Sequence, residues 1–483
     1  MCLALTTSPN ASSTKNSSVT ETARRRCLSD AQGREHVPLF AGNTQRYAKT
    51  MPKEFLIPDL YRSEIIKTVK NARQILDPRK KDRKPAVLDL GPVRFLIPRH
   101  FGFCYGVENA IDIAYRTVEE HPGKNIYLLS EMIHNPTVNK DLEARGVRFL
   151  FETDGTERIS IESLSPDDIV IVPAFGTTLE IQQKLERQGI NPYQYDTTCP
   201  FVIKVWKRGK QLGSKGYSLV IHGKYQHEET RATFSHSAQE APCVVVLNPE
   251  EAHILADIIL EKRPRSDFQK YFGMKCTDGF DPVGDMKRIG VINQTTMLAT
   301  ETREVMQILR DAVEKKYGVS AANSGSGAAT GSGSASENSP GVEMHFADTT
   351  DTLCYATNEN QSATYGLMDE RADMALVVGG YNSSNTMHLV ELLEERFPTY
   401  HIRDASEIKS RNEIHHFNQW SNEVERTRNW MPKATEPVTI ALTSGASCPD
   451  ALVDEVLLKV ASYFEGCRPV EEALKPFREE ATH

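Results

Sequence analysis

Short apolar runs alternate with amphipathic stretches along most of this 483-residue chain. The runs are rich in β-branched residues, and each fits a buried strand: Val93–Pro98, Asn125–Ser130, Asp168–Pro173, Ser218–His222, Cys243–Leu247, Arg288–Asn293, Met374–Gly379 and Thr439–Thr443. Helical periodicity follows several of them, as in Val107–Glu120 and Met387–Arg396. Buried strands that alternate with helices are typical of α/β units with parallel sheets. We therefore expect an α/β fold.

Composition and charge exclude several classes of protein. Hydrophobic residues make up 39% and charged residues 25% of the chain, which fits a soluble globular protein. The net charge of −8 argues against a nucleic-acid partner bound on a basic face. No run of apolar residues is long enough to span a membrane. The nine cysteines form no CxxC pair, which favours an intracellular chain over a disulfide framework or a zinc ribbon.

Two low-complexity stretches interrupt the pattern. Residues 1–52 are rich in Ser and Thr, and we expect either a disordered extension or an organellar targeting segment. Residues 320–341 are rich in Ser, Gly and Ala, and we expect a flexible insertion. The other predicted segments are a lead-in over 53–92, α/β units over 93–196, 197–319 and 342–448, and a C-terminal helix and tail over 449–483. We expect a bacterial cytoplasmic protein, or a plastid protein if the extension is a transit peptide.

Three cysteines stand at similar places in the three predicted units. Cys104, Cys199 and Cys354 each lie beside Gly, Pro or an aromatic residue and ahead of a predicted helix. Thiolates are the preferred ligands of iron–sulfur clusters, and a helix N-terminus lowers the pKa of a thiol. A buried cysteine also serves simply as a small apolar side chain. The residues alone leave both interpretations open.

Several strand ends are followed by small polar residues and then by a helix. The segments are GGYNSSNTMHL, NQTTM and TSGASCPD. Free backbone N–H groups and the helix dipole make such places suited to phosphate, and side chains add donors at Ser383, Ser384, Asn385 and Ser447. Taken alone, each loop is better explained as an ordinary helix N-cap.

Two histidines and one glutamate also follow predicted strands. His134 and His227 lie in polar loops without the HExxH spacing of a zinc protease. Glu229, two residues after His227, is a candidate proton donor if it is buried, and otherwise a solvated carboxylate.

Taken in order, eight segments resemble the 4-hydroxy-3-methylbut-2-enyl diphosphate reductase family. The resemblance runs from about Val93 to Glu465. The segments are FGFCYGVENAIDIAY, EMIHNPTVNKDLEARGV, DTTCPFVIKVW, GKYQHEET, NQTTM, CYATNENQ, GGYNSSNT and TSGASCPD.

The resemblance implies a fold, a cofactor and a set of site residues. It implies a trefoil of three α/β units with parallel sheets around a central [4Fe–4S] cluster. Cys104, Cys199 and Cys354 would hold this cluster and leave its fourth iron without a protein ligand. The residues implied to bind the substrate diphosphate are His134, His227, Ser383, Ser384, Asn385 and Ser447. Glu229 would supply protons, and Thr295 would form a hydrogen bond near the substrate hydroxyl.

The implied activity is the reductive dehydroxylation of 4-hydroxy-3-methylbut-2-enyl diphosphate to isopentenyl and dimethylallyl diphosphate. This is the last step of the methylerythritol phosphate route to isoprenoids, and its electron donor is of the ferredoxin or flavodoxin type. An alternative from another class is a non-catalytic iron–sulfur redox sensor. A metal-dependent phosphohydrolase is a third, but no motif gathers the Asp and Glu ligands that hard cations prefer.

The chain departs from many bacterial members at two places. Phe175 stands where those members carry His, and Glu228 stands where they carry Pro, as in the plant and cyanobacterial branch. The loss of an imidazole removes one possible donor to the diphosphate. Our hypothesis is that Lys224, in the same loop as His227, replaces the lost charge.

Overall fold

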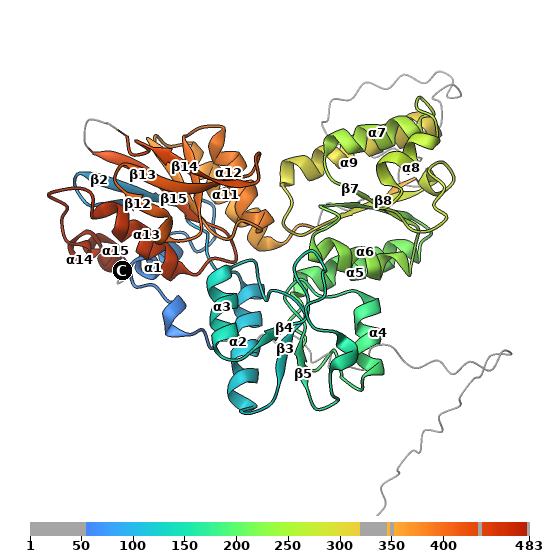
Figure 1. Ribbon diagram of the computed structural model, residues 1–483. Helices are drawn as coiled ribbons and strands as arrows, with labels where there is room; N and C mark the ends of the chain where they lie inside the picture. Colours follow the sequence, from blue (N-terminus) through green and yellow to red (C-terminus); the bar gives the residue numbers. More distant parts are fainter. Residues whose placement is uncertain (1–54, 319–344, 348–351, 433–436, 481–483) are drawn as a thin grey trace, which may run out of the picture. The chain divides into compact units, whose positions relative to one another are not determined.

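The computed structural model describes residues 55–318, 345–347, 352–432 and 437–480. The predicted extension over 1–52 and the predicted insertion over 320–341 lie outside these residues, so both expectations stay predictions. No helix in the described ranges is long and apolar enough to cross a bilayer. Three separate sheets form within residues 55–483, each with its own helices (Figure 1).

The smallest sheet has three parallel strands in the order β4-β3-β5. Its strands are Arg148–Phe149 (β4), Ile126–Leu128 (β3) and Ile169–Ile171 (β5), and its helices are Tyr105–Glu120 (α2), Pro136–Ala144 (α3) and Leu179–Arg187 (α4). Ile126 and Leu128 pack with residues of α2 and α3, whereas Tyr127 packs with Leu185 of α4. Because successive side chains of a strand point to opposite faces, both faces of this sheet are covered.

The second sheet has four parallel strands in the order β7-β6-β8-β9. The strands are Cys243–Val246 (β7), Ser218–His222 (β6), Ile289–Asn293 (β8) and Phe346–Ala347 (β9). One face packs on Pro249–Ile259 (α7), Ser266–Phe272 (α8) and Ala299–Tyr317 (α9), and the other on Pro200–Gly213 (α5) and Glu228–Ala238 (α6) (Figure 1).

The third sheet has eight strands in the order β1-β2-β15-β10-β11-β13-β12, with β14 paired to β13. The strands are Ala86–Asp89 (β1), Val93–Ile97 (β2), Val438–Ser444 (β15), Met374–Val378 (β10), Thr399–Ile402 (β11), Glu413–Asn418 (β13), Ile408–Ser410 (β12) and Glu423–Arg428 (β14). Strands β2, β15, β10 and β11 are parallel, and the outer pairs are antiparallel.

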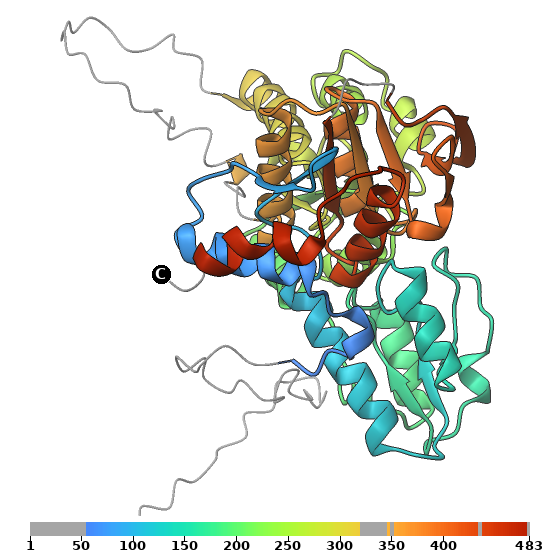
Figure 2. The same ribbon diagram turned by 90° about the vertical axis from the view of Figure 1, so that its left-hand side faces the viewer.

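Helices cover both faces of the third sheet. They are Tyr355–Met368 (α11) and Ser384–Glu394 (α12) on one face, and Ile65–Leu76 (α1), Asp450–Ala461 (α13), Val470–Ala473 (α14) and Lys475–Glu480 (α15) on the other. Helix α1 lies beside α13 and α15, as the two views agree (Figure 1 and Figure 2). Short 3₁₀ helices occur at Asp59–Tyr61, Ile161–Ser163, Asp285–Lys287 and Ala405–Glu407.

The eight predicted strands all form, and the α/β fold with parallel sheets is confirmed. Two strands pair in other sheets than the predicted units imply. Strand Val93–Ile97, predicted to begin the first unit, pairs with β15 in the third sheet. Strand Phe346–Ala347, predicted to belong to the third unit, pairs with β8 of the second sheet. The third sheet is also mixed rather than wholly parallel. Strand pairing depends on long-range partners, which the local hydrophobic pattern does not identify.

Candidate functional site

One cavity brings together every site residue predicted from the sequence. Its lining draws on helices and loops of all three sheets. The predicted residues that line it are Cys104, His134, Cys199, His227, Glu229, Thr295, Cys354, Ser383, Ser384, Asn385 and Ser447. The lining includes no Lys or Arg among the residues described. An anion bound here would therefore be held by neutral donors, by helix N-termini and by imidazoles.

The three cysteines occupy equivalent positions, each as the N-cap residue of a helix. Cys104 precedes α2, Cys199 precedes α5, and Cys354 precedes α11. The sulfur of Cys354 accepts a hydrogen bond from the backbone N–H of Thr357 at 3.2 Å. The positive end of each helix dipole therefore points at a sulfur atom, which favours the thiolate form.

A glycine lets the first two cysteines approach each other. A Cβ placed on Gly106, in the first turn of α2, would lie 2.5 Å from the sulfur of Cys199. Such a contact is too short for any side chain, so only glycine leaves room for this sulfur. The GFCYG segment therefore supplies both a thiol and the space for its neighbour.

Burial opposes ionisation of all three thiols. Burial, together with the neighbouring thiols, raises the pKa of Cys104 and Cys354 to about 12 and that of Cys199 to about 11. A positively charged metal centre removes this barrier, because metal ligation deprotonates a thiol. No three His, Cys, Asp or Glu residues of the described chain gather around a position for a single metal ion. The sulfur donors instead come from three helix starts around one cavity, a donor set that fits an iron–sulfur cluster.

His134 and His227 contact each other in the wall of the cavity. Their Nε2 atoms are 3.2 Å apart. Nδ1 of His227 accepts a hydrogen bond from the backbone N–H of Glu229 at 3.2 Å, so the neutral ring of His227 carries its proton on Nε2. Burial, followed by the neighbouring positive groups, lowers the pKa of His227 well below its usual value. Its Nε2–H is therefore a neutral donor directed toward His134.

The two departures from the bacterial pattern both contact His134. The ring of Phe175 stacks on the His134 imidazole, with centroids 4.2 Å apart and an interplanar angle of 23°. The carboxyl group of Glu228 lies 3.5 Å from Nε2 of His134, and burial raises the pKa of this carboxyl. From the sequence, Glu228 was identified only as a residue shared with the plant and cyanobacterial branch of the family. Nothing in the motif indicates that its carboxyl group faces His134.

Lys224 does not line the cavity. Its side chain is exposed, and its backbone N–H donates to Oε1 of Gln294 at 3.1 Å. Its positive charge is one of those that lower the pKa of His227, so the hypothesis that this lysine replaces the missing imidazole charge stays a prediction.

Glu229 is buried and bound to Thr295. Its carboxylate accepts hydrogen bonds from the backbone N–H of Thr295 at 2.6 Å and from the Thr295 hydroxyl at 2.9 Å. Burial raises the pKa of Glu229 to about 7, although the hydrogen bonds from Thr295 act in the opposite direction. A carboxyl group with a pKa near neutrality is suited to donate and recover a proton.

The polar loops predicted from the sequence supply both hydrogen-bond donors and acceptors. The side chain of Ser383 caps α12, and that of Ser447 donates to the carbonyl oxygen of His134 at 3.1 Å. Oδ1 of Asn385 accepts from the backbone N–H of Ala446 at 2.8 Å. Nδ2 of Asn385 is buried and has no partner among the described residues. An unpaired buried donor is costly, and a bound anion would satisfy it.

Three further residues support the site and were missed from the sequence. Gln294 donates to the hydroxyl of Ser384 at 3.1 Å, and Asn360 donates to Oδ1 of Asn385 at 3.2 Å. Thr357 donates to the sulfur of Cys354. All three stand within quoted motifs, so their place in the motif was the available signal. Their roles depend on which loops meet in space.

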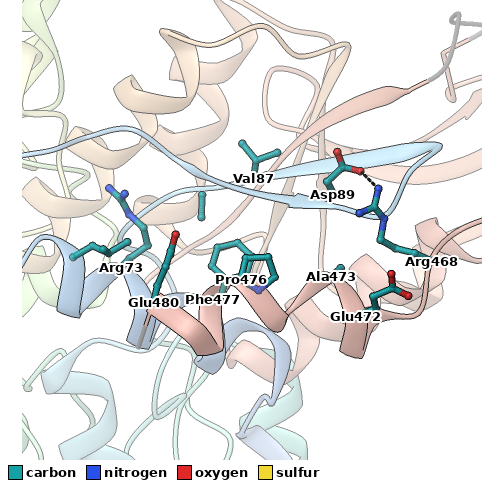
Figure 3. A pocket seen from close by; sticks show the side chains of 11 residues that line it. Arg73, Val87, Asp89, Arg468, Glu472, Ala473, Pro476, Phe477 and Glu480 are labelled. Atoms are coloured by element: carbon teal, nitrogen blue, oxygen red, sulfur yellow. Dashed lines mark hydrogen bonds and ion pairs between the residues drawn. The ribbon is translucent and has the colours of Figure 1, made fainter. Parts of the chain in front are cut away.

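A larger pocket, of about 330 Å³, lies between α1, β1, α14 and α15 (Figure 3). It is lined by Arg73, Phe477 and Glu480, and by the ion pair of Arg468 with Asp89 at 3.4 Å. None of the predicted site residues lines this pocket. The candidate site is therefore identified by its chemistry and not by its size.

Comparisons with known proteins agree with this geometry. A family model described as LytB protein matches residues 96–461. The chain is 39% identical to the 4-hydroxy-3-methylbut-2-enyl diphosphate reductase of Gloeobacter violaceus, over 77% of this chain and 83% of that protein. It is 36% identical to the reductase of a Synechococcus species, over 86% of this chain and 94% of that protein.

A solved structure from Plasmodium falciparum resembles the fold. It is described as E-1-hydroxy-2-methyl-but-2-enyl-4-diphosphate reductase, and the match has a TM-score of 0.51 at 19% identity. The match covers 75% of this chain and 86% of that one. At this identity the likeness supports the fold alone.

Proposed function

This chain belongs to the LytB family, and its relatives in that family are 4-hydroxy-3-methylbut-2-enyl diphosphate reductases. We propose that this chain catalyses the reduction of 4-hydroxy-3-methylbut-2-enyl diphosphate as well. The substrate takes up two electrons and two protons, loses its hydroxyl group as water, and becomes isopentenyl or dimethylallyl diphosphate. One observation carries the proposal. Three helix-capping thiols, a set of anion donors and a buried carboxyl group of raised pKa line the same cavity.

The proposed ligands of the family's [4Fe–4S] cluster are Cys104, Cys199 and Cys354. When bound, the cluster supplies the electrons for the reduction. The chain contributes three sulfur donors whose thiolate forms are favoured by helix N-termini. Gly106 supports this assignment, because it leaves the space beside the Cys199 sulfur free.

The proposed diphosphate site consists of neutral donors. The Nδ2 group of Asn385 lacks a partner in the part of the chain that the structure describes, Ser383 and Ser384 stand at the start of α12, and His227 carries a donor on Nε2. These groups bind and orient the diphosphate. Ser447, whose hydroxyl donates to the backbone carbonyl oxygen of His134, and the imidazole of His134 complete the proposed set.

The proposed proton donor is Glu229. Its pKa of about 7 leaves a substantial protonated fraction at neutral pH, and Thr295 holds the carboxyl group from two sides. Glu229 donates its proton to the departing hydroxyl oxygen, which leaves as water. The two products differ in the allylic carbon that receives the second proton.

A redox sensor would use the same three cysteines but would need neither Glu229 nor the donor loops. The presence of all of them around one cavity favours the reductase.

The test is anaerobic turnover of the purified full chain with a reduced viologen dye. We expect dye oxidation and both five-carbon diphosphates. Cys104→Ala, Cys199→Ala and Cys354→Ala should each lose bound iron and activity. Cys243→Ala is the matched control, since Cys243 is fully buried within the second sheet and does not line the cavity. Iron-loaded protein that produces neither diphosphate would overturn the proposal, and so would normal iron content in all three cysteine variants.

A further inference from the structure

The loop that joins α1 to β1 is strongly basic. Residues 78–84 contain Arg79, Lys80, Lys81, Arg83 and Lys84 against a single acid, Asp82, and all seven residues are exposed. The whole chain, in contrast, carries a net charge of −8. The loop is therefore a local cationic surface on an acidic protein.

This basic loop packs against α11, the helix that Cys354 caps. A Cβ placed on Gly366 of α11 would overlap the carbonyl oxygen of Arg83, so the helix needs glycine where the loop crosses it. Arg99 donates to the carbonyl oxygen of Asp82 at 3.2 Å and forms an ion pair with Glu359 of α11 at 3.1 Å. The backbone of the loop is thus fixed to the helix while its charged side chains stay in solvent.

The basic loop also reaches the residue next to Cys354. The ammonium group of Lys80 lies 4.7 Å from the centroid of the Tyr355 ring and donates a hydrogen bond to its hydroxyl. Tyr355 is the first residue of α11, and 45% of it is exposed. The ring of His100 packs against the same tyrosine with centroids 6.1 Å apart. A cationic and partly aromatic surface therefore lies one residue from a proposed cluster ligand.

We propose that the basic loop, residues 78–84, and Tyr355 form the docking surface for a small acidic electron-carrier protein. The inference rests on the proposed function, which consumes two electrons in each turnover. Each docking event transfers one electron, so that the carrier is oxidised and the cysteine-held centre is reduced. Two docking events supply one reaction.

Charge complementarity explains why the loop is needed. A protein of net charge −8 repels an acidic carrier at long range, and a cationic surface beside the redox centre reverses that repulsion locally. Complementary charges raise association rates by orders of magnitude at low salt, and added salt screens the effect. The loop lies beside Cys354, a proposed cluster ligand, so a partner bound there would be close to the proposed redox centre. This favours an electron-carrier protein over other polyanions.

The test reverses three charges whose side chains are exposed, in the variant Lys81→Glu/Arg83→Glu/Lys84→Glu of the full, cluster-loaded chain. The matched control is Lys215→Glu/Lys270→Glu/Lys287→Glu, which makes the same change of charge on the unit of the second sheet. The probe is an acidic [2Fe–2S] ferredoxin, and a flavodoxin serves as a second arm. Affinity for the oxidised carrier is measured by calorimetry, and turnover is measured with the reduced carrier and, separately, with a reduced viologen dye.

We expect the loop variant to weaken carrier affinity and carrier-driven kcat/KM tenfold or more at low salt, with little difference at 0.5 M salt. Viologen-driven turnover and the control variant should stay within twofold of the unaltered chain. Unchanged affinity for both carriers would overturn the proposal, and so would an equal loss with viologen. Binding of phosphatidylserine vesicles that the variant abolishes, with carrier affinity intact, would assign the loop to a membrane surface instead. If the unaltered chain fails to turn over with viologen, the proposed function fails, and carrier affinity still decides the docking surface.

Discussion

The carboxylate of Glu229 is held from two sides by Thr295, through its backbone N–H at 2.6 Å and its hydroxyl at 2.9 Å. Glu229 lies in the first turn of α6, and Thr295 lies in the loop after β8. Because two separate elements hold the group, its position relative to the rest of the cavity is rigid. Both residues are buried. The first two predictions follow from this pair.

Glu229→Gln should lower kcat by about 100- to 10,000-fold, which is the usual contribution of a positioned proton donor. Glutamine keeps the shape of the side chain and can accept the hydrogen bond from the Thr295 backbone, but it carries no transferable carboxyl proton. Anaerobic viologen-driven turnover measures the change. Bound iron, measured in parallel, should match the unaltered chain. A kcat within tenfold of the original would exclude Glu229 as the proton donor.

The pH profile of kcat should decline as pH rises through about 7. Burial raises the pKa of Glu229 to about 7, and only the protonated form donates, so activity is retained below this pH and lost above it. Thr295→Val removes a hydroxyl donor that stabilises the ionised carboxylate. The pKa should therefore rise and the decline should move to higher pH. A shift toward lower pH would contradict the assignment.

Phe175→Ala should raise KM for the substrate roughly 2- to 10-fold, with a smaller effect on kcat. The ring of Phe175 stacks on His134, and stacked aromatic pairs contribute about 0.5–1.5 kcal/mol. Its loss leaves the imidazole less well oriented toward the diphosphate. Steady-state kinetics at several substrate concentrations separate the two constants.

Lys224→Ala serves as the companion variant to Phe175→Ala. The side chain of Lys224 is exposed and does not line the cavity, so KM should change less than twofold. A tenfold rise would instead favour the hypothesis that Lys224 replaces the missing imidazole charge.

Asp454→Ala should destabilise the protein by about 1–3 kcal/mol, the cost of leaving buried donors without a partner. The carboxylate of Asp454, on α13, accepts from the hydroxyl of Ser63 at 2.6 Å and from the backbone N–H groups of Ile65 and Ile66 at 3.2 Å each. Asp454 therefore accepts hydrogen bonds from backbone N–H groups in the first turn of α1, which have no partner within the helix. Urea unfolding measures the loss, with the exposed neighbour Glu455→Ala as the control. Equal midpoints for the two variants would refute the capping role.

The strands and the chemical groups of the site were predictable because their signals are local. A buried strand such as β6 appears as an apolar run, and a helix start such as that of α12 appears as a polar residue after a strand. The ordered motifs around the cysteines then identified the family. Gln294 and Asn360 were not predictable as site residues, because their importance lies in contacts with Ser384 and Asn385 from other segments.

The sequence by itself determined which residues we propose for the chemistry: three thiols ahead of helices, a glutamate after a histidine, and donor loops at strand ends. Only the tertiary structure decided how they meet. In the structure, Val93–Ile97 pairs within the third sheet and Phe175 stacks on His134. The side chain of Lys224 is exposed, and the basic loop packs against α11. The physical reason is that propensity and hydrophobic period act over a few residues, whereas strand pairing, burial and pKa depend on segments that are distant along the chain.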